Sequence, residues 1–138
     1  MSVTRADYLL PSTIMSFTVW ILQFLLAFAF VAAGVTKLVT PTAKLRRRMA
    51  WTETFSPWSI KLIGALELLG GLGLFLPPIV AFVPAVFTLL SAFGLAVMMI
   101  GAIAVHLRGK EAREGLPALV LLVFLILLIF GLFAVDRF

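Results

Sequence analysis

The 138-residue chain contains no cysteine and a single histidine, His106. Without cysteine it can form neither disulfides nor thiolate nucleophiles, and it has no thiolate ligand for an iron–sulfur cluster or a haem. One histidine also excludes a bis-histidine haem or a multi-histidine metal site within one copy. The sequence contains no glycine-rich nucleotide loop, metal-ligand cluster or Ser-His-Asp set. We therefore expect no metal site and no covalent cofactor.

Charged residues are also scarce, at 12% of the chain, whereas 63% of the residues are hydrophobic. Soluble domains are about half apolar and about a quarter charged, so this composition predicts a membrane protein. Crossing a bilayer core takes about 20 helical residues. Four apolar runs are near that length, at residues 14–36, 60–76, 79–105 and 116–135. We predict an all-α fold, a polytopic membrane four-helix bundle that forms one domain over residues 1–138. Pro84 cannot donate a backbone hydrogen bond, so the regular part of the third helix is expected to begin after it.

Basic residues cluster in the two segments that join the first run to the second and the third to the fourth. The chain carries a net charge of +5, and nine of its eleven bases lie there: Lys37, Lys44, Arg46, Arg47, Arg48, Lys61, Arg108, Lys110 and Arg113. Only Arg5 and Arg137 lie on the other side. Because basic loops remain in the cytoplasm, we predict cytoplasmic loops at residues 37–61 and 106–115. Both termini are then outside, and the chain lies in the cell inner (plasma) membrane. The segment AKLRRRMAW predicts a short helix on the membrane surface.

Glu67 is the only acid or base in the interior of any apolar run. A carboxylate at membrane depth costs a few kcal/mol, so it marks a candidate functional site. Gly64 and Gly71 share its helical face, and small residues let a neighbouring helix come close. Glu67 is therefore expected to face the interior of the bundle. A second seam, in the third run, also predicts close helix packing and contains Ser91, Gly94, Met98, Gly101 and Val105.

Three further residues are candidate partners of Glu67. Gln23 is the only strongly polar residue deep in the first run, and it shares a helical face with Lys37 at the end of that run. His106 ends the third run on the same predicted side of the membrane. We predict a ligand-binding site formed by Glu67, Lys37, His106 and Gln23. Simpler roles remain open: an interhelical bond for Glu67, a snorkelling side chain for Lys37 and a solvated ring for His106.

Three segments, AGVTKL, IGALELLGGLGLFLP and GAIAVHLRGKE, carry a family resemblance. They resemble the DoxX-like family of small four-helix membrane proteins over nearly the whole chain. The glycine-flanked Glu67 is the most specific part of the match, and Lys37 and His106 match less specifically. The family takes its name from a subunit associated with thiosulfate:quinone oxidoreductase. Other members are linked to redox-stress complexes or to receptor assembly, so the resemblance implies a fold more directly than an activity.

The residues and the resemblance together favour a protein that binds a lipophilic ligand, a quinone or a lipid, at the polar site around Glu67. Serving as an accessory subunit of a membrane redox complex is equally open, with a redox protein as partner. A second hypothesis is an enzyme or redox subunit in which Glu67 and His106 carry protons to a quinone, although a chain without cysteine and with one histidine is not expected to be an oxidoreductase on its own. The alternatives are a membrane assembly chaperone or scaffold and a small proton-coupled exporter. Nucleic acid is not an expected partner, because the bases are those of topology loops.

Overall fold

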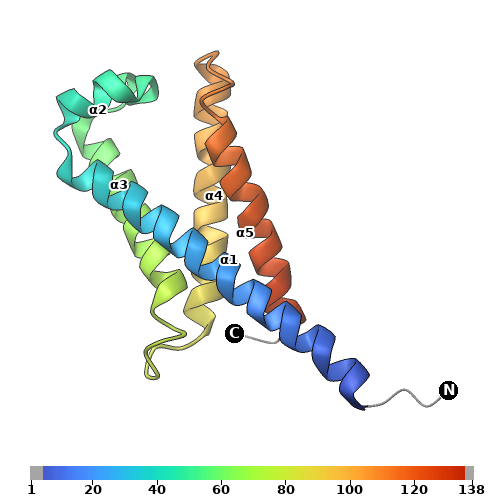
Figure 1. Cartoon of the computed structure of the whole chain (residues 1–138). Coiled ribbons are helices and arrows are strands. Elements are labelled where there is room, and N and C mark those ends of the chain that lie inside the picture. Colours follow the sequence, from blue (N-terminus) through green and yellow to red (C-terminus); the bar gives the residue numbers. More distant parts are fainter. Residues whose placement is uncertain (1–4, 136–138) are drawn as a thin grey trace.

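The computed structural model describes residues 5–135, and they are helical throughout apart from turns (Figure 1). The elements in order are α1 (Arg5–Val39), α2 (Thr42–Arg48), the 3-10 helix η1 (Ala50–Thr54), α3 (Pro57–Phe75), α4 (Val86–Arg108) and α5 (Leu116–Ala134). Four of them, α1, α3, α4 and α5, are long and apolar enough to cross a membrane. The predicted all-α, four-span fold is confirmed, and the chain is a multi-pass membrane protein.

The long helix α1 runs obliquely across the bundle (Figure 1). It packs most extensively on α3, while α4 and α5 form a hairpin that contacts α3 and α1. The core between these helices is built from aliphatic side chains and one phenylalanine, including Leu26, Phe30, Leu74, Leu95, Leu125 and Leu128. Many other apolar side chains remain exposed, among them Phe28, Val97 and Phe130. An apolar outer surface of this extent suits contact with lipid rather than water.

The helices do not begin and end where the apolar runs do, because a helix can extend past the apolar residues or be delayed by a proline. α1 begins at Arg5 rather than residue 14, because a helix can continue into polar sequence beyond the membrane core. α4 begins at Val86, shortly after Pro84, which confirms that the proline delays the regular helix. Residues 76–85 form turns instead of helix, with Val83 N–H donating to the Val80 carbonyl. α3 begins where Ser56 accepts a hydrogen bond from Ser59 N–H at 3.2 Å, with Pro57 in the first turn.

The basic segment after α1 folds as predicted into a short helix, α2, followed by η1. Leu45 of α2 is fully buried, and Arg46 Nη2 donates to the Phe55 carbonyl at 3.3 Å. α2 lies at the same end of the bundle as the α4–α5 turn, whereas the α3–α4 link lies at the opposite end (Figure 1). The two basic segments of the sequence therefore share one end of the molecule.

The seam predicted in the third span packs within this chain at Ser91 and Met98, which lie against Gly73 of α3 and against the core, but the prediction is wrong for its two glycines. Gly94 and Gly101 are exposed, and a Cβ added at either would meet no atom within 4 Å. α4 instead buries a different face, which includes Ala92, Leu95 and Met99. These residues are larger than glycine, and so they bury more apolar area against α3 and α5 than the seam could.

Candidate functional site

The backbones of α1 and α3 come close together at glycine residues. A Cβ added at Gly34 would lie 2.6 Å from both the Gly64 carbonyl oxygen and the Leu68 nitrogen. A Cβ added at Gly71 would lie 2.9 Å from the Val31 nitrogen and 3.0 Å from the Ala27 carbonyl oxygen. Gly34 of α1 thus lies against the earlier part of α3, and the preceding turns of α1 lie against Gly71, later in α3. The two helices are therefore antiparallel. Only residues without side chains allow two backbones to approach this closely.

Lys37 and Glu67 form a buried ion pair at this contact. Lys37 Nζ lies 2.6 Å from Glu67 Oε2, and the two residues are 7% and 5% exposed. Each follows a contact glycine, Gly34 or Gly64, by one helical turn. Side chains tilt toward the N-terminus of their own helix, and in antiparallel helices these tilts point toward each other. The long lysine side chain thereby reaches the carboxylate from the end of α1.

Lys61 holds the end of α1 that carries Lys37. Its ammonium donates to the carbonyls of Lys37, Leu38 and Thr40 at 2.7, 2.9 and 2.7 Å. These carbonyls belong to the last turn of α1 and the residue that follows it, where a helix leaves acceptors unpaired and favours a cation. From the sequence, Lys61 was expected only to contribute to the basic loop. Its spacing from Glu67, nearly two turns along α3, was the available signal that it lies beside the same helix end.

Gln23 lies buried in the same α1–α3 interface but not at the ion pair. Its Nε2 donates to the Leu74 carbonyl at 2.7 Å, near the end of α3. That carbonyl would normally accept from the residue four positions later, which is Pro78 and has no N–H. Gln23 therefore supplies a missing donor. It precedes Lys37 by 14 residues, or about 21 Å along the helix axis at 1.5 Å per residue.

His106 lies in the last turn of α4, away from the α1–α3 contact, and is 9% exposed. Gly115 packs on it, since a Cβ added at Gly115 would lie 3.1 Å from His106 Cβ. One ring nitrogen of His106 and one carboxylate oxygen each of Glu111 and Glu114 lie within 4.8 Å of one another. This group could not be predicted from the sequence, because the turn that folds residues 109–115 back onto α4 carries no strong sequence signal. The structure thus brings Lys37 and Glu67 together and holds Gln23 and His106 at two other positions.

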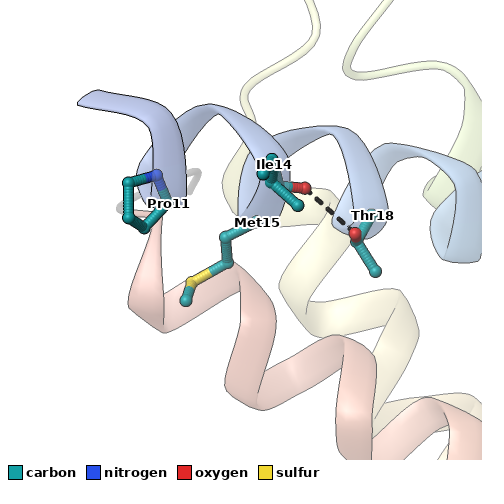
Figure 2. Close-up of a pocket in the computed structure, with 4 residues that line it drawn as sticks. All are labelled: Pro11, Ile14, Met15 and Thr18. Atoms are coloured by element: carbon teal, nitrogen blue, oxygen red, sulfur yellow. Dashed lines mark hydrogen bonds between the residues drawn. The ribbon is translucent and has the colours of Figure 1, made fainter. Parts of the chain in front are cut away.

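Apolar hollows open on the surface of the described part of the chain, among them two that are defined by their lining residues. One, of about 490 Å³, lies along the start of α1 and is lined by Pro11, Ile14, Met15 and Thr18 (Figure 2). Its one hydroxyl is already used, because Thr18 Oγ1 donates to the Ile14 carbonyl at 2.9 Å (Figure 2). The other, of about 470 Å³, lies between α3 and α4 and is lined by Leu66, Leu69, Gly70, Phe87, Leu90, Ser91, Gly94, Leu95 and Met98. Both suit apolar chains rather than charged ligands.

Comparison with known proteins identifies one family. The family model described as the DoxX-like family matches residues 21–130. This region covers most of the described chain and contains all four predicted site residues, Gln23, Lys37, Glu67 and His106. No curated protein and no solved structure matches the chain.

Proposed function

The chain belongs to the DoxX-like family, and on that premise we propose that it binds the polar head of a lipophilic molecule, a quinone or a lipid, at the Lys37–Glu67 pair. The observation that carries the proposal is the pair itself, two charges buried in apolar helices. Ionisable groups at membrane depth are costly and commonly mark ligand or proton sites.

The pair retains hydrogen-bonding capacity that a ligand head could use. Lys37 Nζ has three N–H groups, and its one hydrogen bond to a described residue is the bond to Glu67 Oε2. Glu67 Oε1 has no partner among residues 5–135. A quinone carbonyl or a lipid phosphate would accept from the ammonium, and a quinol hydroxyl would donate to the free carboxylate oxygen. Leu66 and Gly70, close to Glu67 in α3, line the α3–α4 groove, which would suit an apolar tail.

Quinone binding would also fit an accessory role in a membrane redox complex. The chain has no cysteine and only one histidine, so one copy cannot form a thiolate or multi-histidine electron-transfer centre. Electrons would then come from a partner protein, while this chain would hold the quinone. A scaffold that only joins helices would need the Lys37–Glu67 bond, but it would have no use for the remaining N–H groups of Lys37 or for Glu67 Oε1.

We expect Glu67→Gln to weaken quinone binding at least tenfold while the fold is retained. Glutamine Oε1 can still accept from Lys37, but the charge and the second carboxylate oxygen are lost. A hydrogen bond to a charged group contributes about 1.5–3 kcal/mol, which is tenfold or more in Kd. The measurement is quenching of tryptophan fluorescence by decylubiquinone in phosphatidylcholine nanodiscs.

The matched control is Glu53→Gln, which removes the same charge from an exposed position in η1. It should bind decylubiquinone as the parent does. Equal affinities for the parent and Glu67→Gln would contradict the quinone site. Native mass spectrometry of gently extracted parent protein would then decide whether a phospholipid occupies the site instead, since its retention should fall in Glu67→Gln alone.

The proposed orientation places the end of the bundle that carries α2 and the α4–α5 turn in the cytoplasm of the cell, with the protein in the plasma membrane. The bias of bases toward these two segments supports it. Ser2 and Arg137, which would report on the termini directly, lie outside the described residues.

Single cysteines can test this orientation, because the parent chain has none. Thr54 in η1 and Ala81 in the α3–α4 link are both exposed, at opposite ends of the bundle. In intact cells an impermeant maleimide should label Ala81→Cys and should label Thr54→Cys only after permeabilisation. The reverse pattern would overturn the orientation.

A further inference from the structure

The turn after α4 has a defined geometry that returns the chain to the end of the helix. Lys110 N–H donates to the Leu107 carbonyl at 3.3 Å, and Glu111 N–H donates to the His106 carbonyl at 3.0 Å. Lys110 adopts a φ of 57°, the left-handed conformation that glycine usually supplies at this position. The pattern is a Schellman motif. It places Glu111 directly beside the last turn of α4, and so beside His106.

A third backbone hydrogen bond brings Glu114 into the same place. Glu114 N–H donates to the Glu111 carbonyl at 2.9 Å, and the chain enters α5 at Leu116. As a result one atom each from His106, Glu111 and Glu114, a ring nitrogen and two carboxylate oxygens, lie within 4.8 Å of one another. Three potential metal ligands thus converge where α4 and α5 join.

The histidine in this cluster is buried and incompletely paired. His106 is 9% exposed, and its Nδ1 is a buried atom without a hydrogen-bond partner in the described part of the chain. A buried ring nitrogen without a partner is uncommon, because the loss of its hydrogen bond to water is uncompensated. Neither carboxylate fills this need, since no His106–glutamate ion pair exists within 4.0 Å among residues 5–135. The ring and the two acids are close together without bonding to one another.

Nearby bases form no ion pair with the two glutamates in the described part of the chain. Arg108, Lys110 and Arg113 are all exposed and within a few residues of them in the sequence. Yet the Lys37–Glu67 pair is the one salt bridge in the described part of the chain. The carboxylates of Glu111 and Glu114 therefore remain available as ligands.

We propose that His106, Glu111 and Glu114 bind a divalent transition-metal ion, and that zinc fits best. One imidazole and two carboxylates are ligands that zinc accepts, whereas calcium and magnesium favour sites made wholly of oxygen. Zinc–nitrogen and zinc–oxygen bonds of about 2.0–2.2 Å place tetrahedral ligands roughly 3.3–3.6 Å apart. From the present limit of 4.8 Å the ligand atoms need to approach one another by at most roughly 1.2–1.5 Å, and Glu114 is exposed. A water molecule would complete the fourth position.

The bound ion would join the end of α4 to the start of α5. His106 belongs to α4, while Glu111 and Glu114 belong to the turn that leads into α5. Zinc would thereby cross-link the hairpin at the end of the bundle that carries the basic segments. This site is separate from the Lys37–Glu67 pair and does not depend on the ligand proposed there.

The test is calorimetric titration of the purified full chain in detergent with zinc chloride, using a purification tag without histidine. We expect the parent to bind one equivalent, and Glu111→Gln and Glu114→Gln each to raise the Kd at least tenfold. Cobalt chloride should give the d–d absorption of a low-symmetry site in the parent and lose it in both variants. Magnesium chloride should show no saturable binding.

Glu114 is exposed, so Glu114→Gln should fold normally and keeps the test decisive even where His106→Gln does not fold. Glu53→Gln, an exposed glutamate in η1, is the matched control and should bind zinc as the parent does. Equal affinities for the parent and the Glu111→Gln/Glu114→Gln double variant would overturn the site. So would the absence of saturable zinc binding to the parent.

Discussion

Replacing Gly34 by alanine is expected to push α1 and α3 apart and to destabilise the protein by about 1–3 kcal/mol, the usual cost of overpacking. The added methyl group would lie 2.6 Å from the Gly64 carbonyl oxygen and from the Leu68 nitrogen. Both are backbone atoms of a helix and cannot move as the tip of a side chain can. Because Lys37 follows Gly34 by one turn, the same displacement should also lengthen the Lys37–Glu67 contact.

Gly94→Ala is the matched control, because it adds the same methyl group to a helix where nothing lies within 4 Å. Alanine favours helix over glycine by up to about 1 kcal/mol, so this variant should be as stable as the parent or slightly more so. Thermal unfolding in detergent, followed by circular dichroism, measures both. A Gly34→Ala variant that unfolds at the temperature of the parent would show that α1 and α3 tolerate a wider separation.

The spans and the α1–α3 contact could be predicted from the sequence because each leaves a local signal. Apolar runs of bilayer length indicate the four helices, and Pro84 marks the start of α4. The spacing of Gly64, Glu67 and Gly71 identifies the buried face of α3. Lys37 could be suggested as the partner of Glu67, but only the structure shows that α1 and α3 are neighbours in the required register.

The remaining site residues were harder to place because their positions depend on contacts between distant segments. The four-residue site assumed that the end of α4 meets the end of α1, whereas His106 packs on Gly115 in its own hairpin. Its neighbour Glu111 is positioned by a Schellman turn with Lys110 at the left-handed position, where a sequence pattern would look for glycine. Gln23 did carry a usable signal. Pro78 leaves the Leu74 carbonyl without its helical donor, and the amide of Gln23 satisfies it.

The exposed glycines Gly94 and Gly101 show that small-residue spacing alone does not predict a helix contact. Small residues at spacings of three and four permit close packing but do not require it within one chain. The same pattern at Gly64 and Gly71 is buried because Gly34 lies opposite Gly64 and an ion pair joins the two helices nearby. A small-residue face therefore predicted a helix contact reliably only where complementary residues on a second helix could be named as well.

The second large effect is expected at the ion pair. Lys37→Met should destabilise the protein by about 3–5 kcal/mol, because it leaves the Glu67 carboxylate buried without its partner. Replacing both residues, as Lys37→Met/Glu67→Leu, should restore stability to that of the parent or raise it by about 1–4 kcal/mol. Two apolar side chains need no compensating charge, and the α1–α3 glycine contact remains.

Thermal unfolding of the parent, Lys37→Met, Glu67→Leu and the double variant gives a double-mutant cycle. Decylubiquinone binding is then measured on each protein that folds. We expect the double variant to be stable yet to have lost quinone binding. That outcome would mean that the pair is present for its ligand, because an apolar contact holds the helices equally well. If the double variant is instead several kcal/mol less stable than the parent, the Lys37–Glu67 pair holds α1 against α3, and its role is structural.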